Sequence, residues 1–437
     1  MASPVKPRLS GWRYKWYTDN YSLLGTDINW FGAGNCGSFY PAGENMYFWK
    51  MLKLGNEEHL TQAQINKVYH LLEKSYNPVA FKNAFGSPVE HLKGDVNYNL
   101  TERYHTDMIF YYNRASFPAA PECQTFMDEW SLNNFPDIRG SKEIWEWDVV
   151  PSRSYQDMAL YWFKKSFKIA GNKGVYIDNW AFDPSYNTMM TSAYKQTNGK
   201  IMPSTGVWKM REYTKRIFIM MNQLHMKPII FLHETSTEIL PIDDFATVRY
   251  DWEWHYSQGD VQDRFPRSYI LMVSTGNLPG NWPVLLSDHG ALEGNPWTQK
   301  TYLGVMIVHD LLGSIDTWVP QLGKLWKTYK EPFLKMAQEK GLIVYNYWGD
   351  RKQPFYSKNY DFPTIIYSIP KQKALVGITS YANKNENVDF IIKPEILGFT
   401  NYKVIDINTG KQIDVKNNKI NIFFKKHDMV VLKITKE

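Results

Sequence analysis

The sequence predicts an α/β fold, a (β/α)8 TIM barrel followed by a C-terminal antiparallel β-sandwich. Through residue 341, short apolar runs of strand-forming residues alternate with segments of helical period, which is the alternation that closes a parallel barrel. Several of these runs end in an acidic residue. Beyond Gly341 the helical pattern stops and short β-rich runs follow. We therefore expect two domains, residues 1–341 and 342–437.

Length and composition fit this assignment. The 437 residues exceed the ~250 of a typical barrel, which leaves room for a second domain. Aromatic residues make up 16% of the chain, more than a core alone requires, and aromatic rings also stack on the apolar faces of sugars. The net charge of +6 is spread along the chain, so we expect no nucleic-acid partner. An oligo- or polysaccharide partner is expected, and the charge would also suit an acidic or sulfated one.

Few features indicate a compartment. Cys36 and Cys123 permit at most one disulfide, and no cysteine cluster for a metal exists. The N-terminal residues lack the apolar segment of a signal peptide, and no run of 18 apolar residues occurs, so we expect no membrane span. We expect a secreted or periplasmic protein whose signal peptide is absent from this chain. The sequence leaves the oligomeric state open.

The first half of the predicted barrel begins at residues 26–34, a strand that turns out through glycines. Residues 57–75 have the apolar spacing of a helix, and 78–83 form a weaker strand. The run 107–113 is a strand that closes on Asn113. A loop over 115–150 follows.

The next elements have clearer boundaries. Residues 154–170 read as a helix that Gly171 stops. The strand 174–180 ends in an acid, an amide and an indole, and a loop over 181–206 follows. A helix over 207–226 then leads directly into the strand 227–234.

The barrel pattern continues with strands at 246–254, 282–288 and 313–318. Between them lie a loop over 255–281 and a helix over 298–312, and a last helix covers 322–340. Turn residues then separate short β-rich runs, which predict the sandwich. These runs are 342–348, 363–369, 373–381, 387–392, 402–406 and 420–434.

Four consecutive predicted strands end in acids: Asp178, Glu234, Asp251 and Asp288. Side chains at the C-terminal ends of barrel strands build the active site of this fold. Hydrolysis of a glycosidic bond needs two carboxyl groups on opposite sides of that bond, about 5 to 9.5 Å apart. The pattern therefore predicts a glycoside hydrolase with its carboxylates at the barrel mouth.

The neighbours of these acids suggest their roles. One carboxylate must stay ionised and the other must have a raised pKa. Asp178 fits the ionised role, because the adjacent Asn179 can hydrogen-bond the anion. Asp251 fits the acid, because Trp252 would desolvate it and thereby raise its pKa, and Glu234 competes for that role. Alternatively, Asp178 only turns the chain through its own backbone.

Other polar and aromatic residues near the strand ends are candidates for substrate contacts. Single histidines suit hydroxyl contacts better than metal ligation, and we expect no metal and no cofactor. No glycine loop for a nucleotide and no serine nucleophile elbow is present. The candidate contacts are Asn113, Arg114, Asn179, Trp180, His233, Trp252, Glu253, Trp254, Asp288, His289 and Trp297.

Asp178 and Asp251 stand at the ends of the fourth and sixth predicted strands, 174–180 and 246–254. Aspartates at these two positions, together with a C-terminal β-sandwich, resemble the retaining α-glycosidases of the α-galactosidase-like clan. This resemblance implies that Asp178 is the nucleophile and Asp251 the general acid/base. The runs Tyr-Ile-Asp-Asn at 176–179 and Phe-Leu-His-Glu-Thr at 231–235 are also similar to bacterial proteins classed with glycoside hydrolase family 123, over roughly residues 105–320.

Family 123 implies an alternative chemistry. Its members use an adjacent Asp-Glu pair in which the Asp orients a substrate acetamido group and the Glu acts as the acid. The one such pair in this sequence is Asp128-Glu129, which we expect in a loop rather than at a strand end. A substrate-assisted N-acetylhexosaminidase is therefore one alternative. A catalytically inactive carbohydrate-binding protein is another, although it would not need several acids at strand ends.

Overall fold

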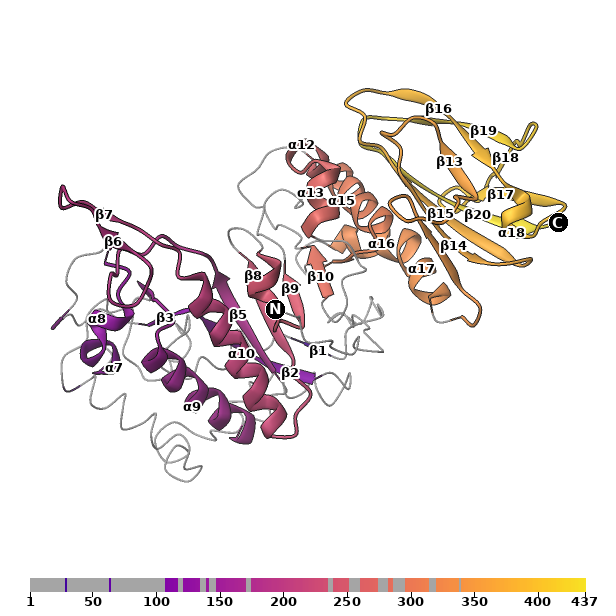
Figure 1. Cartoon of the computed structure of the whole chain (residues 1–437). Helices are drawn as coiled ribbons and strands as arrows, with labels where there is room; N and C mark the ends of the chain where they lie inside the picture. Colours follow the sequence, from indigo (N-terminus) through magenta and orange to yellow (C-terminus); the bar gives the residue numbers. More distant parts are fainter. Residues whose placement is uncertain are drawn as a thin grey trace. The chain divides into compact units, whose positions relative to one another are not determined.

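The computed structural model divides the chain into two compact units, residues 1–15, 25–252 and 279–281 in the first and 16–24, 253–278 and 282–437 in the second (Figure 1). The strand expected at 78–83 and, apart from residue 63, the helix expected at 57–75 lie outside the described residues. The described residues are 28–29, 63, 107–116, 121–133, 139–140, 147–169, 174–234, 239–250, 260–273, 282–285, 295–313, 320–337 and 339–437.

The first unit contains a parallel sheet whose described strands lie side by side in chain order. Each corresponds to a strand that the sequence predicts. Helices connect the later strands, as the predicted α/β alternation requires. The strands are β1 (Ile28–Asn29), β2 (Asp107–Asn113), β5 (Gly174–Trp180), β8 (Ile230–Glu234) and β9 (Val248–Tyr250), and the helices are α9 (Arg153–Ile169), α10 (Val207–Gln223) and α11 (Leu240–Asp243).

Helices α9 and α10 pack on one face of β5 and β8 (Figure 1). Alternate strand residues join the helices in one buried cluster, because side chains along a strand point to opposite faces of the sheet. On α9 the buried positions recur every four residues, which is the apolar stripe of an amphipathic helix. The strand members are Val175, Ile177, Trp180, Ile230 and Leu232, and the helix members include Tyr155, Ala159, Phe163, Met210, Tyr213, Ile217 and Met221.

The segments expected to be loops contain short elements. Their two-residue strands and four- or five-residue helices are too short to show a period in the sequence. Trp130 anchors the first segment, since its buried indole donates to Ser154 Oγ at 2.8 Å. These elements are β3 (Ala115–Ser116), α7 (Pro121–Thr125), α8 (Met127–Trp130) and β4 (Trp147–Asp148) in the first segment, and β6 (Tyr194–Lys195) and β7 (Ile201–Met202) in the second.

The second unit begins with helices and one pair of parallel strands. The helix expected over 322–340 is in fact two helices, because Pro332 cannot donate the backbone hydrogen bond that a continuous helix would need. Helices also occur in the segment expected to be a loop over 255–281. The elements are α12 (Val261–Arg264), α13 (Arg267–Val273), β10 (Trp282–Leu285), α15 (Pro296–Val308), β11 (Leu312–Gly313), α16 (Pro320–Tyr329) and α17 (Glu331–Met336).

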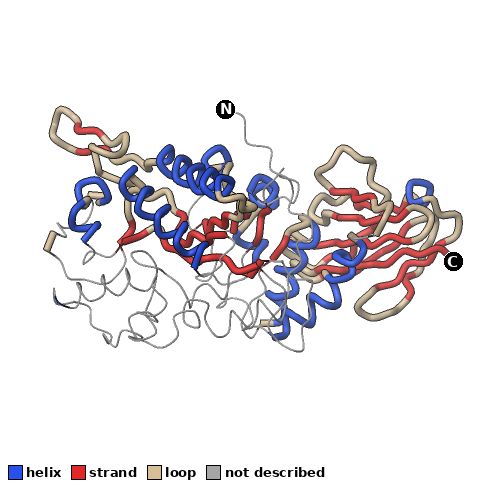
Figure 2. The backbone as a smooth tube through the Cα atoms, turned by 90° about the horizontal axis from the view of Figure 1, so that it is seen from below, coloured by secondary structure: helices blue, strands red, loops and turns tan. Residues whose placement is uncertain are grey.

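The C-terminal strands form two antiparallel sheets, seen as red layers in Figure 2. Their inner faces share one buried cluster, in which Phe390 stacks on Phe355 with ring centroids 5.2 Å apart. This is the sandwich that the sequence predicts, although the run 420–434 divides into two strands. One sheet has the order β12 (Ile343–Asn346), β14 (Thr364–Ile369), β15 (Lys373–Thr379), β20 (Met429–Lys436), β17 (Tyr402–Asp406) and β18 (Gln412–Ile413), and the other has β13 (Phe355–Ser357), β16 (Glu386–Ile392) and β19 (Lys419–Phe424).

The outer face of the six-stranded sheet packs on helices of the same unit. Phe333 of α17 meets Tyr367 of β14 edge-on, with ring centroids 5.2 Å apart. The domain boundary predicted at residue 341 follows the change in secondary structure, whereas the compact unit also contains α12 to α17. Among the described residues, no helix is long and apolar enough to cross a membrane. Cys123 is buried and has a free thiol.

Gly304 allows the close approach of α15 to the sheet. A Cβ at this position would lie 2.6 Å from Thr379 Oγ1 and 2.8 Å from Met429 Cβ. We expect Gly304→Ala to lower the free energy of unfolding by about 1–3 kcal/mol, because β15, which carries Thr379, and β20, which carries Met429, cannot move away from α15 without repacking. The matched variant Gly349→Ala should change it by less than about 0.5 kcal/mol, since its nearest contact would be 3.4 Å. Urea unfolding measures both, and equal midpoints would contradict the packing.

Candidate active site

Asp178 lies at the C-terminal end of β5, level with Asn113 at the end of β2. Val175 and Ile177 face the helices, so Tyr176 and Asp178 face the opposite side of the sheet. In a closed barrel that opposite side is the interior, and its C-terminal end is where catalytic groups lie. The predicted position of Asp178 at a strand end is therefore present in the structure.

The Asp178 carboxylate is held by two donors. Its Oδ1 lies 2.6 Å from His233 Nδ1 and accepts the Asn179 backbone N–H at 2.9 Å. An ionised carboxylate only accepts, so this contact requires a proton on His233 Nδ1. The Tyr176 hydroxyl lies 2.7 Å from the same nitrogen. The side chain of Asp178 retains 18% exposure, compared with 6% for His233.

These contacts bear on the alternative that Asp178 only turns the chain. The Asn179 N–H contact is local and fits such a turn, and Asn179 itself has a left-handed φ of 49°. His233, however, comes from the neighbouring strand β8 and is not needed for a turn. A buried imidazole that orients a partly exposed carboxylate is an arrangement suited to chemistry.

Arg114 supports a second group of acids beside Asp178. The side chain is 2% exposed, and its guanidinium donates to the Val149 carbonyl at 2.5 Å and to the Asp183 carboxylate. The Asp148 carboxylate lies 3.9 Å away. A buried guanidinium needs such partners. Arg114, predicted as a substrate contact, is therefore placed as a residue that positions acids.

Asp148 is a carboxyl group that the sequence interpretation missed. Burial raises its pKa, Arg114 opposes this increase, and the negative charges of Asp183 and Asp178 add to it. These three acids consequently share one electrostatic site. The available signal was the Trp145-Glu-Trp-Asp148 run, whose alternation of acids and indoles matches that of residues 251–254.

Trp180 and Glu234 occupy the helix-covered side of the sheet. The strand register shifts between Ile177 and Trp180, so Trp180 pairs with Glu234 and points with Ile177 toward the helices. Trp180 is fully buried, and its indole N–H donates to Asp243 Oδ1 at 2.8 Å. Glu234 is 1% exposed. Trp180 is thus a core residue rather than a sugar platform, and the position of Glu234 does not favour proton donation to a substrate.

The remaining predicted residues are not brought together with Asp178 by the described structure. Trp297 lies at the start of α15, where the Lys300 and Lys425 ammonium groups are each 5.6 Å from its ring centroid. Asp128 and Glu129 lie in α8, not in a plain loop, and Glu129 accepts from the Ser154 hydroxyl. The predicted residues outside the described part of the chain are Asp251, Trp252, Glu253, Trp254, Asp288 and His289.

One cluster with metal-ligand chemistry occurs in the second unit, within the residues that the structure describes. It consists of Asp260, Asp263 and His427. Asp260 and Asp263 form a capping box at the start of α12, and His427 Nδ1 lies 3.0 Å from Asp260 Oδ2. The Lys426 ammonium is 2.9 Å from Asp263 Oδ1. Capping and ion pairing account for this cluster, so it carries no metal assignment.

Removal of Arg114 should destabilise the fold. We expect Arg114→Met to lower the free energy of unfolding by about 2–4 kcal/mol, because Asp183 and Asp148 lose their counter-charge and the Val149 carbonyl loses its donor. Arg153→Met is the matched control, because Arg153 and its partner Asp157 are 73% and 54% exposed, and it should cost less than about 1 kcal/mol. Urea unfolding at neutral pH compares them, and equal costs would refute a structural role for Arg114.

Asp243 should make stability depend on pH. Burial raises its pKa from 3.8 to about 6, against the hydrogen bonds from Trp180 and from the Ile239 N–H. An acid whose pKa is higher in the folded state loses stabilisation as pH rises through that window. Relative to Asp243→Asn, the wild type should therefore lose up to about 3 kcal/mol between about pH 4 and about pH 6.

The amide of Asp243→Asn also points its NH2 group at a backbone donor, which adds an offset that does not vary with pH. The informative quantity is thus the change with pH of the difference between the two proteins in unfolding free energy. Urea unfolding at several pH values measures it. A difference that stays constant from about pH 4 to about pH 7 would contradict a raised pKa of Asp243 in the folded state.

No protein-family model matches this sequence, and no curated protein matches it. Solved structures that this chain is similar to include a family 27 β-L-arabinopyranosidase from Geobacillus stearothermophilus, with 11% identity, a TM-score of 0.49, and coverage of 78% of this chain and 77% of that one. A maltogenic α-amylase from Thermotoga neapolitana has 8% identity, a TM-score of 0.48, and coverage of 81% and 83%.

The α-galactosidase I of Mortierella vinacea is similar at 12% identity with a TM-score of 0.43, over 82% of this chain and 83% of that one. All three of these structural neighbours are glycosidases. The assignment of this site rests on the geometry around Asp178.

Proposed function

We propose that this chain is a glycoside hydrolase that cleaves an oligo- or polysaccharide by a retaining mechanism, with Asp178 as the nucleophile. One observation carries the proposal: Asp178 ends a parallel strand on the face away from the helices, with Oδ1 held by His233 and by the Asn179 N–H. The proposal includes a closed (β/α)8 barrel within residues 1–341 and a sandwich over 342–437. It also includes secretion or a periplasmic location.

The mechanism requires Asp178 to attack the anomeric carbon while the leaving oxygen receives a proton. A covalent glycosyl–enzyme forms, and water then releases the sugar. With Oδ1 anchored by two donors, the carboxylate keeps one orientation, which lowers the cost of reaching an attack geometry. His233 acts here as a positioning residue. Its own orientation is supported by the hydroxyl of Tyr176.

Asp251 is our first choice for the proton donor. It follows β9 directly, and β9 pairs with β8, the strand that carries His233. Asp148 is a second choice, because its raised pKa meets one requirement of a general acid. Glu234 is the weakest of the three, because it lies on the side of the sheet that the helices cover.

The decisive experiment separates the nucleophile from the donor by leaving-group dependence. A panel of α- and β-linked aryl glycosides and polysaccharides first identifies a substrate. We expect Asp178→Asn to lose about 10³-fold or more in kcat with every leaving group, since the covalent step disappears. The variant that lacks the donor, Asp251→Asn or Asp148→Asn, should lose kcat/KM most with poor leaving groups and little with activated ones, because only poor leaving groups need protonation. Its kcat with activated leaving groups should still fall, because water then attacks the glycosyl–enzyme without a general base.

Azide provides an independent readout of the two roles. It should restore turnover of the donor variant and give a glycosyl azide of retained configuration, because azide needs no general base. Asp350→Asn, an exposed acid on the second unit, is the control and should retain full activity. An active Asp178→Asn would refute the nucleophile assignment, and Asp128-Glu129 would then be the pair to test. Saccharide binding without any cleavage by the wild type would favour the inactive binding protein.

A further inference from the structure

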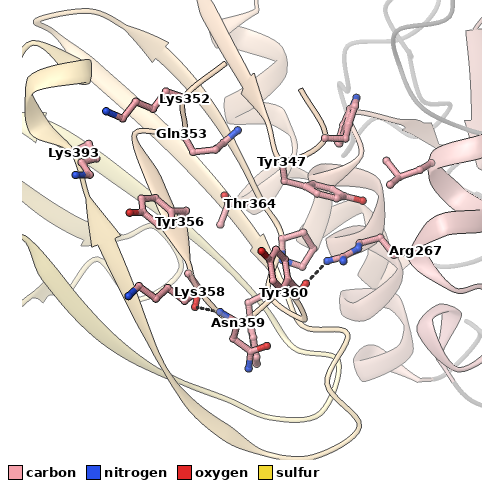
Figure 3. Close-up of a pocket in the computed structure, with 15 residues that line it drawn as sticks. Arg267, Tyr347, Lys352, Gln353, Tyr356, Lys358, Asn359, Tyr360, Thr364 and Lys393 are labelled. Carbon is pink, nitrogen blue, oxygen red and sulfur yellow. Dashed lines mark hydrogen bonds between the residues drawn. The ribbon is translucent and has the colours of Figure 1, made fainter. Parts of the chain in front are cut away.

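A pocket of about 810 Å³ opens on the second unit, and none of its lining residues is one that was assigned above to the chemistry. Its walls come from β13 and the segments that flank it, from the start of β14, from α13 and from Lys393 after β16 (Figure 3). The volume lies within the range of about 300–1,000 Å³ that small-molecule sites occupy. The pocket is therefore large enough for an oligosaccharide of a few units.

The aromatic wall of this pocket is held in place from behind. The Tyr347 hydroxyl lies 2.7 Å from His309 Nε2, and His309 Nδ1 lies 2.8 Å from the Val305 carbonyl oxygen. A carbonyl only accepts, so Nδ1 carries the proton and Nε2 accepts from Tyr347. Burial lowers the pKa of His309 to about 4, which keeps this tautomer at neutral pH. Trp348 stacks on the imidazole with centroids 6.0 Å apart.

A second set of contacts fixes the part of the rim next to Tyr347. Arg267 donates to the backbone carbonyl of Tyr360 and lies over the ring of Tyr347, 5.2 Å from its centroid. The Tyr360 side chain is left 83% exposed. Gln353 donates to the Asn346 carbonyl at 2.6 Å, which orders the segment after β12. A pocket with preordered walls loses little conformational entropy when a ligand binds.

The lining combines aromatic rings, neutral polar groups and positive charge. Tyr347, Tyr356 and Tyr360 surround the hollow in Figure 3, and Lys352 and Lys358 lie on the side away from Arg267. Rings of this kind stack on the apolar faces of sugars, and the amides and hydroxyls nearby match sugar hydroxyls.

The charges of the lining indicate which sugars would bind. No Asp or Glu lines the pocket, while Arg267, Lys352, Lys358 and Lys393 do. None of the three ammonium groups pairs with a carboxylate of the described residues. Glu386 accepts from Asn359 at 3.4 Å, and the exposed Asp350 and Asp361 are neighbours in sequence that do not line the pocket. A lining that contains cations and no carboxylate favours an anionic ligand.

We infer that this pocket is an accessory binding site for an anionic oligosaccharide, one that carries carboxylate or sulfate groups. Single-stranded nucleic acid also uses aromatic rings and cations, but it needs a groove that follows a backbone over several nucleotides. The compact volume and the four neutral polar side chains of the lining, Gln353, Ser357, Asn359 and Thr364, favour a sugar. The inference does not depend on the proposed hydrolysis, because it concerns binding alone.

The test is calorimetric binding of short oligosaccharides to the whole chain, with two charge-matched comparisons. Oligogalacturonate is compared with its methyl ester for the carboxylate source, and sulfated dextran oligomers with plain dextran oligomers for the sulfate source. We expect at least one anionic member to bind about ten-fold or more tightly than its neutral partner, and to weaken as NaCl rises from about 0.05 to about 0.5 M.

Two variants connect the binding to the pocket. Tyr360→Ala should weaken it about ten-fold or more by removing a stacking face. Lys352→Gln/Lys358→Gln should weaken it about five-fold and reduce the salt dependence. Both alter exposed side chains, so the fold should survive, which thermal unfolding verifies. The matched controls are Phe423→Ala, which removes an exposed ring outside the pocket, and Lys411→Gln/Lys416→Gln, which removes exposed charges outside it.

Several results would overturn the inference. Absence of binding by both anionic oligosaccharides is one, and equal affinity for the charged and neutral partners is another. An effect of the control variants as large as that of the pocket variants would show general polyanion binding. Tighter binding of an oligothymidylate, lost in Tyr360→Ala, would assign the pocket to single-stranded nucleic acid instead.

Discussion

Alternation of side chains along the parallel strands is the constraint on which the candidate site depends. Because Val175 and Ile177 are committed to the core beneath α9 and α10, Asp178 must face the other side of the sheet. The same alternation in β8 brings His233 beside Asp178 and Leu232 beneath the helices. Hydrophobic burial thus orients the polar groups. The apolar and polar side chains of these strands could not exchange faces of the sheet without exposing apolar surface and burying charge.

The local register shift in β5 is the one departure from this alternation. Asn179 adopts a left-handed conformation, and the following Trp180 returns to the helix side, where it pairs with Glu234. The bend places the indole of Trp180 in the core two residues after the partly exposed carboxylate of Asp178. Bulges that re-aim side chains are common beside active sites. Here the bulge allows the strand to end with Asp178 on one face and a buried anchor on the other.

Ion pairs also position the acids beside Asp178. A buried guanidinium, that of Arg114, is compensated by Asp183 and Asp148, and those acids in turn affect each other. Burial raises the pKa of Asp148, Arg114 opposes this increase, and the negative charges of Asp183 and Asp178 add to it. In the second unit the six-stranded sheet packs on the three-stranded sheet through its inner face and on helices through its outer face. The aromatic and cationic residues of the pocket lie on β13 of the three-stranded sheet and on the segments beside it.

The sequence by itself determined the order and type of the main elements. Residues 154–170 and 207–226 were predicted as helices that the structure places at Arg153–Ile169 and Val207–Gln223, because long amphipathic patterns reflect burial of one face. It also identified Asp178 at a strand end. Only the tertiary structure decided that Trp180 and Glu234 face the helices, because a one-residue shift reverses every later side chain. It alone joined Arg114 to Val149 and Asp183, which are 35 and 69 residues away, since contacts over such separations leave no period in the chain.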